Sequence, residues 1–259
     1  MRSELQKLTN KTALITGSAR GFGKAMAIRF AEEGANIIIN DLREEEMNDT
    51  AKEIQDLGRE VITIKADVSK RNDVQELISR SLHSWNKIDI LVNNAGTFRH
   101  KDFLEMTDDD WDIVLNVDLK GPFLVSQAIA KHMIARKYGK IINIASIAGL
   151  GSSNIEMANY ASAKAGLIQL TKVIARRLGP YGINVNCIAP GFVVTDFTFM
   201  NRTPKEVKTI TEYRTRNAIL GRAGTTADIA NLALFLASDE SSFITGQTIL
   251  CDGGRIDRW

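Results

Sequence analysis

The chain alternates short, mostly apolar runs with longer stretches in which apolar residues recur at helical spacing. The apolar runs cover residues 12–16, 35–40, 61–65, 88–93, 140–146, 183–189 and 247–252. Runs without polar alternation are typical of strands buried on both faces, as in a parallel sheet covered by helices. The stretches between them, such as 25–34, have the spacing of helices. We therefore expect an α/β, Rossmann-like, doubly wound sheet of seven mostly parallel strands, with helices on both faces.

The organisation of the chain favours a single domain over residues 1–259. Its length of 259 residues is within the range of one large α/β domain, and none of its 4 prolines interrupts a predicted strand. No linker, repeat or low-complexity segment divides the sequence. Residues 193–218 do not fit the alternation of strands and helices. They follow Pro190-Gly191 and separate the sixth predicted strand from the next predicted helix. We expect this segment to be an insertion at the edge of the sheet.

Composition and charge narrow the possible partners. The chain is 44% hydrophobic and 25% charged, with a net charge of +2, so nothing favours nucleic acid or an acidic membrane surface. The polar start lacks the core of a signal peptide, and no apolar run approaches the roughly 18 residues of a membrane span. Cys187 and Cys251 are expected to be free, and the three histidines show no metal-binding spacing. We expect a cytoplasmic protein without a metal.

A glycine-rich segment, "TGSARGFG" at 16–23, joins the first predicted strand to the first predicted helix. Its glycines, Gly17, Gly21 and Gly23, follow a G-x-x-x-G-x-G spacing. Glycines let the backbone approach a pyrophosphate, and the N-terminus of the following helix offers free N–H groups and a positive dipole end. The position between strand and helix predicts a dinucleotide site, with a merely tight turn as the alternative.

An acidic residue ends the second predicted strand. Asp41 lies about 20 residues beyond the glycine loop, where a carboxylate accepts hydrogen bonds from the adenosine ribose hydroxyls. The same carboxylate repels a 2′-phosphate, which favours NAD over NADP as the cofactor. Arg20 and Arg43 act against this preference if either of them pairs with that phosphate, and otherwise they are solvated surface charges.

Three side chains with acid–base chemistry follow the fifth predicted strand. Ser146 ends that strand, and Tyr160 and Lys164 lie four residues apart, on one face of a predicted helix. A ketone that accepts hydride develops negative charge on its oxygen, which Tyr160 can protonate and Ser146 can stabilise by a second hydrogen bond. A Lys164 ammonium and an oxidised nicotinamide are expected to lower the pKa of Tyr160. The alternative is a packed tyrosine beside a snorkelling lysine.

Together these motifs resemble the short-chain dehydrogenase/reductase family in its single-domain form, over nearly the whole chain. The matching segments are "TGSARGFG", "NNAG" (93–96), Asn116 in "VLNVD", Ser146, "YASAK" (160–164), "APGFVVT" (189–195), "LGRAGTTADIANLALFLASDE" (220–240) and "ITGQTILCDGG" (244–254). Any one of these segments alone is too short to identify a family. Their common order favours this family.

The resemblance assigns roles to individual residues. It implies catalytic roles for Ser146, Tyr160 and Lys164, with Asn116 holding a water that relays protons to Lys164. Residues 193–218 would be a lid over the substrate. The cofactor-binding residues it implies are Gly17, Ser18, Arg20, Gly21, Phe22, Gly23, Asp41, Leu42, Asp67, Val68, Asn94, Ala95, Gly96, Tyr160, Lys164, Pro190, Gly191, Val193 and Thr195.

The implied function is NAD(P)-dependent interconversion of a secondary alcohol and a ketone, with an alcohol, sugar, polyol or hydroxysteroid as substrate. The alternatives are a 3-oxoacyl-thioester reductase, acting on acyl carrier protein or CoA, and a non-catalytic dinucleotide-binding regulator. Carrier-dependent relatives place two basic residues beside the mouth of the active site. Lys137 matches the first of these positions, whereas Tyr181 occupies the second.

The resemblance also implies a homotetramer. Family members usually associate through two long helices, here expected at about 109–138 and 158–179, and through the last strand. Both predicted helices carry apolar residues on more than one face, as expected for helices that pack on the sheet and on a partner.

Overall fold

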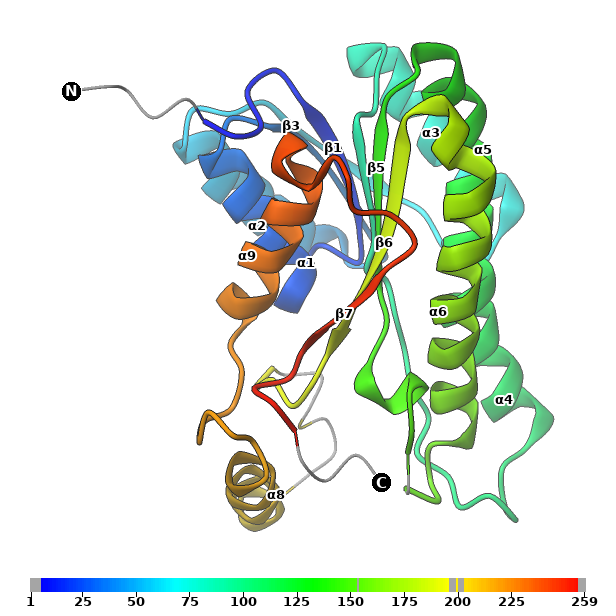
Figure 1. Ribbon diagram of the computed structural model, residues 1–259, viewed down its shortest axis with the longest axis vertical. Coiled ribbons are helices and arrows are strands. Elements are labelled where there is room, and N and C mark those ends of the chain that lie inside the picture. The colour runs from blue at the N-terminus through cyan, green and yellow to red at the C-terminus, as the bar shows by residue number, and fades with distance from the viewer. Residues whose placement is uncertain (1–5, 153, 196–198, 200–202, 256–259) are drawn as a thin grey trace.

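Seven parallel strands form the centre of the protein in the computed structural model, which describes residues 6–152, 154–195, 199 and 203–255. Their spatial order is β3-β2-β1-β4-β5-β6-β7 (Figure 1). The strands are β1 (Thr12–Thr16), β2 (Asn36–Asp41), β3 (Val61–Lys65), β4 (Ile90–Asn93), β5 (Gly139–Ile144), β6 (Ile183–Pro190) and β7 (Thr248–Cys251). Each predicted apolar run overlaps one of these strands, so the expected doubly wound sheet is confirmed, with every pairing parallel.

Helices cover both faces of the sheet. They are α1 (Gly21–Glu32), α2 (Glu44–Asp56), α3 (Arg71–Trp85), α4 (Asp108–Leu115), α5 (Gly121–Arg136), α6 (Ala158–Leu178), α8 (Pro204–Arg216) and α9 (Thr226–Ala237). Figure 1 shows α1, α2 and α9 on one side of the sheet and α3, α5 and α6 on the other. The helix α8 lies beyond the end of the sheet, near the carboxyl ends of β6 and β7.

The strand side chains divide between two hydrophobic cores, one on each face. In β2, Ile37 and Ile39 join the core beneath α1, α2 and α9, whereas Ile38 joins the core beneath α3, α5 and α6. All three side chains are fully buried. Alternate residues of a strand point to opposite faces, so burial of both faces favours apolar side chains on both. This explains why the strands are mostly apolar, with a few buried polar residues such as Asn93 and Asn143.

The helix expected at about 109–138 is interrupted by a π turn. The turn, η1 (Asn116–Lys120), lies between α4 and α5, so the helical segment runs from Asp108 to Arg136. By length and composition alone this segment could cross a membrane. In the fold, however, side chains of α5 such as Leu124 and Ile129 are buried in the core shared with α3 and α6. The apolar composition therefore reflects packing on the sheet.

Buried polar contacts fix α5 and α6 against the middle of the sheet. The Asn93 side-chain amide donates to Ser126 Oγ of α5 at 3.0 Å and to Asn143 Oδ1 of β5 at 2.8 Å. The Asn143 amide in turn donates to Thr171 Oγ1 of α6 at 2.9 Å. Buried amides have strong geometric preferences because an unmade bond there costs free energy. The network therefore sets the position of α6, whose first turns carry Tyr160 and Lys164.

The segment expected to form a lid, 193–218, includes residues 196–198 and 200–202, which lie outside the described residues. The described part is mainly α8. Its first turn is closed by a capping box in which the Thr203 and Glu206 side chains bond each other's backbone N–H groups. None of the α8 residues is fully buried. Because few apolar contacts hold it, α8 belongs to the less stable end of the fold.

Candidate active site

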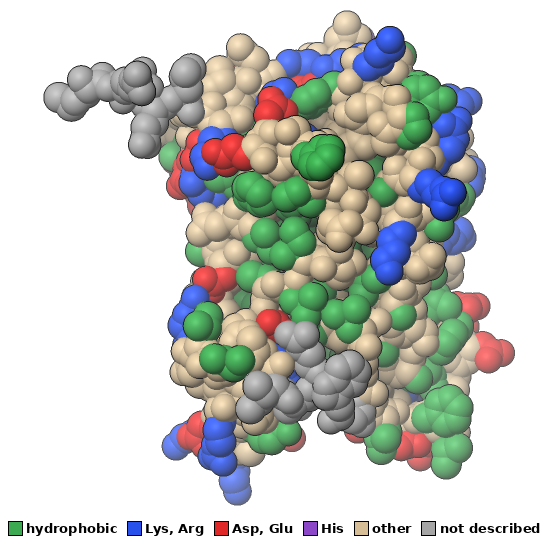
Figure 2. All heavy atoms as spheres, in the orientation of Figure 1, with side chains coloured by type: hydrophobic (Ala, Val, Ile, Leu, Met, Phe, Trp, Pro, Cys, Tyr) green, Lys and Arg blue, Asp and Glu red, His purple; other side chains and the backbone are tan. Residues whose placement is uncertain are grey.

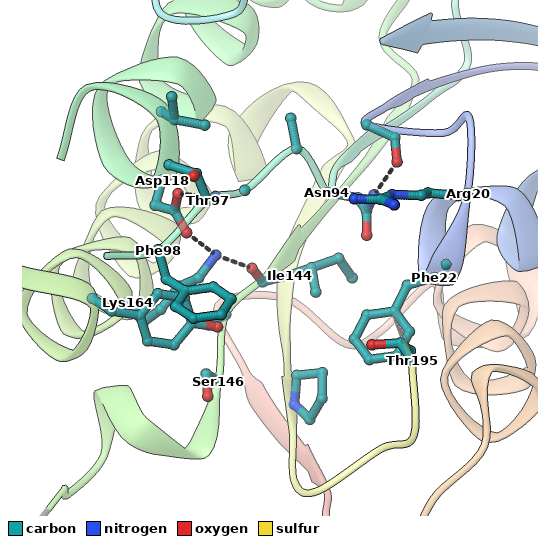
Figure 3. Close-up of a pocket in the computed structure, with 18 of the residues that line it drawn as sticks. Arg20, Phe22, Asn94, Thr97, Phe98, Asp118, Ile144, Ser146, Lys164 and Thr195 are labelled. Carbon is teal, nitrogen blue, oxygen red and sulfur yellow. Dashed lines mark hydrogen bonds and ion pairs between the residues drawn. The ribbon is translucent and has the colours of Figure 1, made fainter. Parts of the chain in front are cut away.

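A cavity of about 550 Å³ opens at the carboxyl ends of the strands. In open parallel sheets, ligands bind at this edge, where the strand order reverses. The reversal here lies between β1 and β4, because the chain runs from β1 through β2 to β3 on one side and continues from β4 on the other. The glycine loop and the end of β2 line the same cavity as Ser146, Tyr160 and Lys164. Figure 3 shows Arg20 and Asn94 on one side of the open space and Ser146 and Lys164 on the other.

Close packing explains the glycines of the loop. Gly17 has a positive φ of 63°, and a Cβ on Gly23 would lie 2.2 Å from the Gly17 carbonyl oxygen. The Asn94 side chain closes the loop from β4, donating to the backbone oxygens of Thr16 at 2.9 Å and Gly17 at 2.8 Å. Any larger side chain at Gly23 would push the loop away from Asn94. The sequence pattern therefore encodes the shape of the turn.

The loop delivers the N-terminus of α1 to the cavity. Arg20 occupies the N-cap position, has an extended backbone and makes no side-chain capping bond. First-turn N–H groups that lack a side-chain cap are donors for an anionic ligand, and the helix dipole adds to the attraction. Gly21 follows with a φ of 58° and open space where a Cβ would lie. These features fit the pyrophosphate of a nicotinamide dinucleotide.

Most of the predicted cofactor residues line this cavity. They are Gly17, Arg20, Gly21, Phe22, Asp41, Leu42, Asp67, Val68, Asn94, Ala95, Gly96, Tyr160, Lys164, Pro190, Gly191, Val193 and Thr195. Ser18 and Gly23 are not among the lining residues. Ser18 is fully buried and donates to the Ile15 backbone oxygen at 2.7 Å, and Gly23 packs under the loop. Both residues therefore shape the glycine loop from behind.

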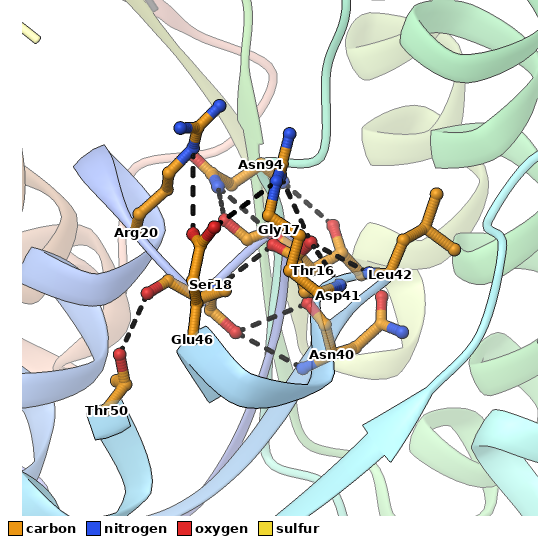
Figure 4. A network of polar contacts seen from close by, with 12 residues as sticks. Thr16, Gly17, Ser18, Arg20, Asn40, Asp41, Leu42, Glu46, Thr50 and Asn94 are labelled. Carbon is orange, nitrogen blue, oxygen red and sulfur yellow. Dashed lines mark hydrogen bonds and ion pairs between the residues drawn. The ribbon is translucent and has the colours of Figure 1, made fainter. Parts of the chain in front are cut away.

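Asp41 is held rigidly at the end of β2 (Figure 4). Its Oδ1 accepts from the backbone N–H groups of Leu42 at 2.8 Å and Arg43 at 3.2 Å, and its Oδ2 accepts from that of Ala19 at 3.2 Å. Its side chain is 7% exposed. Backbone donors fix a carboxylate without any loss of side-chain rotamers in the donors. Asp41 is thus a preorganised acceptor at the wall of the cavity.

The two arginines near Asp41 both face a second acid. Glu46 lies 3.9 Å from Arg20 Nε and 3.6 Å from Arg43 Nε, and Arg43 Nη1 also lies 3.4 Å from Asp41 Oδ1. The Arg20, Arg43 and Glu46 side chains are all at least 36% exposed. Pairs this exposed contribute little free energy, so solvent and ligands compete for the arginines.

Lys164 is buried beside the cavity and makes two polar contacts. Its Nζ donates to the Ile144 backbone oxygen at 3.0 Å and lies 3.0 Å from Asp118 Oδ2 (Figure 3). Burial acts to lower the pKa of Lys164, but the Asp118 carboxylate and Tyr160 raise it above its ordinary value. Lys164 therefore keeps its ammonium charge. An ammonium has three donors, so one N–H remains for a further acceptor.

Tyr160 and Ser146 meet at the same point of the cavity wall. The Lys164 Nζ lies 5.5 Å from the Tyr160 ring centroid, and Phe98 packs edge-on against that ring at 6.4 Å. Ser146 Oγ accepts from the Ala148 N–H at 3.1 Å as the cap of a short helical turn, η2 (Ile147–Gly149). A hydroxyl oriented by an acceptor bond has its own proton available to donate. The structure thus brings the predicted Ser–Tyr–Lys set together.

The expected lowering of the Tyr160 pKa is corrected by the surroundings of its hydroxyl. Burial raises the pKa of Tyr160, and the nearby Asp118 carboxylate raises it further. The Lys164 ammonium and a hydrogen bond with Ser146 lower it, but they do not outweigh the other two effects. The expected contribution of an oxidised nicotinamide stays a prediction. In this state the residue is a phenol, the form that an acid needs.

The structure does not place Asn116 beside Lys164, where its expected role requires it. Asn116 is not among the residues that line the cavity, and its Oδ1 accepts from Lys120 Nζ at 3.3 Å. Asp118 lines the cavity and faces Lys164. Two residues along a helix differ by about 200° in direction, so only one of the pair can point at Lys164. The sequence signal for Asp118 was an acidic residue between apolar neighbours in a helix that packs on the sheet.

The rest of the cavity is largely apolar. Beyond the catalytic set it is lined by Phe98, His100, Ile113, Met157, Phe192, Ile210 and Arg214. Phe98 and Phe192 contribute aromatic rings to this lining. Arg214, from α8, is the residue of this group with a permanent positive charge.

The two positions compared with carrier-binding relatives do not flank this cavity within one chain. Lys137 ends α5 just before the amino end of β5, and Tyr181 precedes the amino end of β6. The cavity lies at the carboxyl ends of the same strands, beyond Ile144 and Pro190. A strand rises by about 3.3 Å per residue, so about 20 Å of sheet separates the two edges. The expectation that this pair lies beside the mouth is therefore corrected.

The described residues give no sign of metal or disulfide chemistry. They contain no cluster of three or more histidine, cysteine, aspartate or glutamate side chains that could hold a metal ion. Cys187 and Cys251 are free thiols, as expected. Burial raises the pKa of Cys187 to about 11, which keeps it in the unreactive thiol form.

Comparison with known proteins agrees with the cavity. The family model described as "Enoyl-(Acyl carrier protein) reductase" matches residues 17–255. The (2S)-[(R)-hydroxy(phenyl)methyl]succinyl-CoA dehydrogenase subunit BbsD of Thauera aromatica is 41% identical over 96% of this chain and 97% of its own. The 3-oxoacyl-[acyl-carrier-protein] reductase FabG of Thermotoga maritima is 40% identical over 96% of this chain and 99% of its own.

A solved structure shows the same architecture with a cofactor bound. The gluconate 5-dehydrogenase of Burkholderia cenocepacia, in complex with NADP and tartrate, has a TM-score of 0.88 and is 36% identical over 96% of each chain. The loop, the strand-edge cavity and the Ser–Tyr–Lys set are thus accompanied by likeness along almost the whole sequence. The chain belongs to the short-chain dehydrogenase/reductase family and is an NAD(P)-dependent oxidoreductase.

Proposed function

We propose that this protein interconverts a 3-oxoacyl thioester and the corresponding 3-hydroxyacyl thioester by hydride transfer. The observation that carries the proposal is the substrate end of the cavity, where apolar side chains surround a single arginine, Arg214. Such a lining suits an acyl chain attached to a larger anionic group. The names of the relatives from Thauera and Thermotoga both specify an acyl thioester substrate. The acyl group is carried by CoA in the first name and by acyl carrier protein in the second.

The placement of the basic residues favours a small thioester over a carrier protein. Lys137 and Tyr181 lie at the amino edge of the sheet, away from the cavity within one chain. Arg214 lines the cavity itself and can meet a phosphate or carboxylate of the substrate. A CoA thioester satisfies both observations.

The reaction needs one proton and one stabilised oxyanion from the protein. When bound, the nicotinamide dinucleotide supplies or accepts the hydride, which is chemistry of the cofactor. Ser146 donates its hydroxyl hydrogen bond to the substrate oxygen, and this bond strengthens as negative charge develops there. Tyr160 gives its phenolic proton to the same oxygen in reduction and takes it back in oxidation. The remaining N–H of Lys164 is available to a ribose hydroxyl of the cofactor.

Replacement of the acid tests this assignment. Tyr160→Phe should lower kcat by about 10²-fold or more, because only the proton donor is removed. The dissociation constant of the reduced cofactor, measured by its fluorescence, should change little. Tyr181→Phe, at the opposite edge of the sheet, serves as the control and should retain wild-type turnover. A Tyr160→Phe enzyme with near-normal kcat would contradict the assignment.

The substrate class is tested by comparing kcat/KM across compounds. We expect acetoacetyl-CoA to exceed gluconate and simple polyols by about 10²-fold or more, because only the thioester fills both the apolar and the cationic part of the cavity. Higher kcat/KM for gluconate would instead favour a sugar-acid dehydrogenase, as in the structural relative from Burkholderia.

Arg214 provides a matched pair of variants for the same question. Arg214→Gln should raise KM for acetoacetyl-CoA by about 10-fold, the usual size of a lost charged hydrogen bond, with a smaller change in kcat. Arg216→Gln removes the same charge two residues along α8, where the side chain is exposed and does not line the cavity. Equal KM values for acetoacetyl-CoA in the two variants would show that Arg214 does not contribute to substrate recognition.

We also propose that NAD is the preferred cofactor. Asp41 is fixed by three backbone N–H groups, whereas Arg20 and Arg43 are exposed and face Glu46. Two like charges about 4 Å apart cost roughly 4 kcal/mol at an effective dielectric of ~20. An arginine that turns to a 2′-phosphate recovers about 1–3 kcal/mol and loses rotamer freedom in doing so. The repulsion therefore outweighs the attraction.

The cofactor preference has a direct kinetic test. On one substrate, kcat/KM with the NAD form should exceed that with the NADP form by about 10-fold or more. Asp41→Ala should narrow or invert this ratio, mainly through KM for the NADP form. Glu46→Gln should narrow it in the same direction by releasing both arginines, whereas Glu45→Gln, exposed on the same turn of α2, should not. A wild-type preference for NADP would show that the arginines control the pocket.

The homotetramer remains a proposal, now supported by exposed apolar side chains on the expected surfaces. Phe123 on α5 is 38% exposed, Val173 on α6 is 56% exposed, and Phe243 before β7 is fully exposed. Figure 2 shows hydrophobic side chains gathered on the face that carries α9 and β7. Separate apolar surfaces on one chain suit an assembly with more than one two-fold axis.

Light scattering tests the assembly. The wild-type protein at micromolar concentration should have the mass of four chains. Val173→Asp should reduce that mass, because a buried unpaired charge would destabilise the α6 contact. Leu57→Asp, an exposed site at the end of α2, should leave it unchanged. A monomeric wild-type mass would refute the proposal.

A further inference from the structure

The Asp118 carboxylate is the completely buried acid of the catalytic end of the cavity. Its side chain is 0% exposed, and it lies in the π turn η1 that separates α4 from α5. Oδ1 accepts from the Thr97 backbone N–H at 2.7 Å, which ties η1 to the loop after β4. A buried carboxylate is stable only where charge and hydrogen bonds compensate the loss of water. The groups around Asp118 therefore indicate how its buried charge is compensated.

The second oxygen of Asp118 faces Lys164. Oδ2 lies 3.0 Å from Lys164 Nζ, within ion-pair distance. Besides Lys164, Oδ2 has no hydrogen-bond partner among the described residues. A purely structural carboxylate would direct both oxygens at fixed donors, as Oδ1 does. Oδ2 instead has an acceptor position left over beside the cavity that Asp118 lines.

Asp118 and the Ile144 carbonyl hold the ammonium from two sides. Lys164 reaches Ile144 at 3.0 Å, so its long side chain spans from α6 to the end of β5 and to η1. Lysine has four flexible bonds, and an ammonium with a single partner could reorient. Two acceptors fix its position, and thereby the direction of the third N–H.

The charges that face this group come from few elements. Tyr160 and Lys164 come from α6, Asp118 from η1, and Cys187 from β6. Cys187 is an uncharged thiol at neutral pH, because burial raises its pKa to about 11. The Asp118 negative charge therefore offsets part of the attraction that Lys164 would otherwise exert on a Tyr160 phenolate.

We propose that Asp118 is a positioning residue of this site, which fixes the Lys164 ammonium and keeps Tyr160 in its protonated, acid form at neutral pH. The consequence is a site prepared for ketone reduction at neutral pH, with alcohol oxidation developing only under alkaline conditions. This inference rests on the proposed role of Tyr160 as the proton donor and acceptor. It does not depend on the identity of the substrate.

The sign of the pH dependence follows from the two directions of reaction. Reduction needs the phenol and is lost as pH rises through the pKa of Tyr160, whereas oxidation needs the phenolate and appears above it. Asp118 raises that pKa. Removing the Asp118 charge should lower the pH at which reduction is lost and the pH at which oxidation appears.

The test compares Asp118→Asn with Asp112→Asn, which removes an equal charge from an exposed position on α4. We measure kcat for oxidation and for reduction across pH, and expect both limbs of Asp118→Asn to move to lower pH. The ratio of oxidation kcat at pH 7 to that at pH 9 should rise by about threefold or more. Asp112→Asn should match the wild type. Profiles of Asp118→Asn that match the wild type, or move to higher pH, would overturn the proposal.

A second measurement does not require turnover. The ultraviolet absorbance of phenolate reports titration of Tyr160 directly, once the signal of a Tyr160→Phe protein is subtracted. The Tyr160 signal should appear at lower pH in Asp118→Asn than in the wild type, and an unchanged midpoint would refute the inference. If Asp118→Asn does not fold, Asp118→Ser gives the same change of charge in a smaller side chain. A wild-type enzyme inactive on every thioester would reject the proposed substrate, and this titration would still decide the role of Asp118.

Discussion

The ion pair between Lys164 and Asp118 is the constraint on which the catalytic end of the molecule depends. Each partner is almost completely buried, and an isolated buried charge would cost several kcal/mol. The pair is tolerable because the Thr97 N–H and the Ile144 carbonyl complete its polar contacts. The contacts join α6, η1, β5 and the loop after β4. Movement of any of these segments would leave a charge without compensation, so the pair holds the catalytic geometry together.

The cofactor end of the cavity is determined by the backbone. The glycine loop, the uncapped start of α1 and the end of β2 all present main-chain groups, and even Asp41 is positioned by main-chain donors. Backbone geometry is set by the fold and tolerates changes of surrounding side chains. This is why a dinucleotide site can be identified across a family whose substrates differ. The two exposed arginines and Glu46 are the variable part of this end.

The substrate end is built differently, from side chains of separate loops and α8. Phe98, Met157, Phe192 and Arg214 come from four different segments, and they reach the cavity only because the fold brings these segments to one edge of the sheet. Such a lining changes by single substitutions without disturbing the sheet. Reaction class and substrate class therefore have separate structural origins in this protein. Likeness to its relatives establishes the first and leaves the second to experiment.

The seven strands were predictable from sequence, because strands covered on both faces are mostly apolar and each one overlaps such a run. The sequence also identified Ser146, Tyr160 and Lys164, since the i, i+4 spacing and the strand end are local features. The same holds for the glycine loop and Asp41.

Which residue of η1 contacts Lys164 depends on the tertiary structure. Asn116 and Asp118 are close in sequence but point in different directions, and the π turn sets the rotation of the helix at that point. In the folded chain, Ser18 and Gly23 lie behind the glycine loop, and Lys137 and Tyr181 lie at the edge of the sheet opposite the cavity. The direction of the Tyr160 pKa depended on burial and on Asp118, neither of which sequence spacing contains. Local patterns specify elements, whereas long-range packing decides which side chains share one environment.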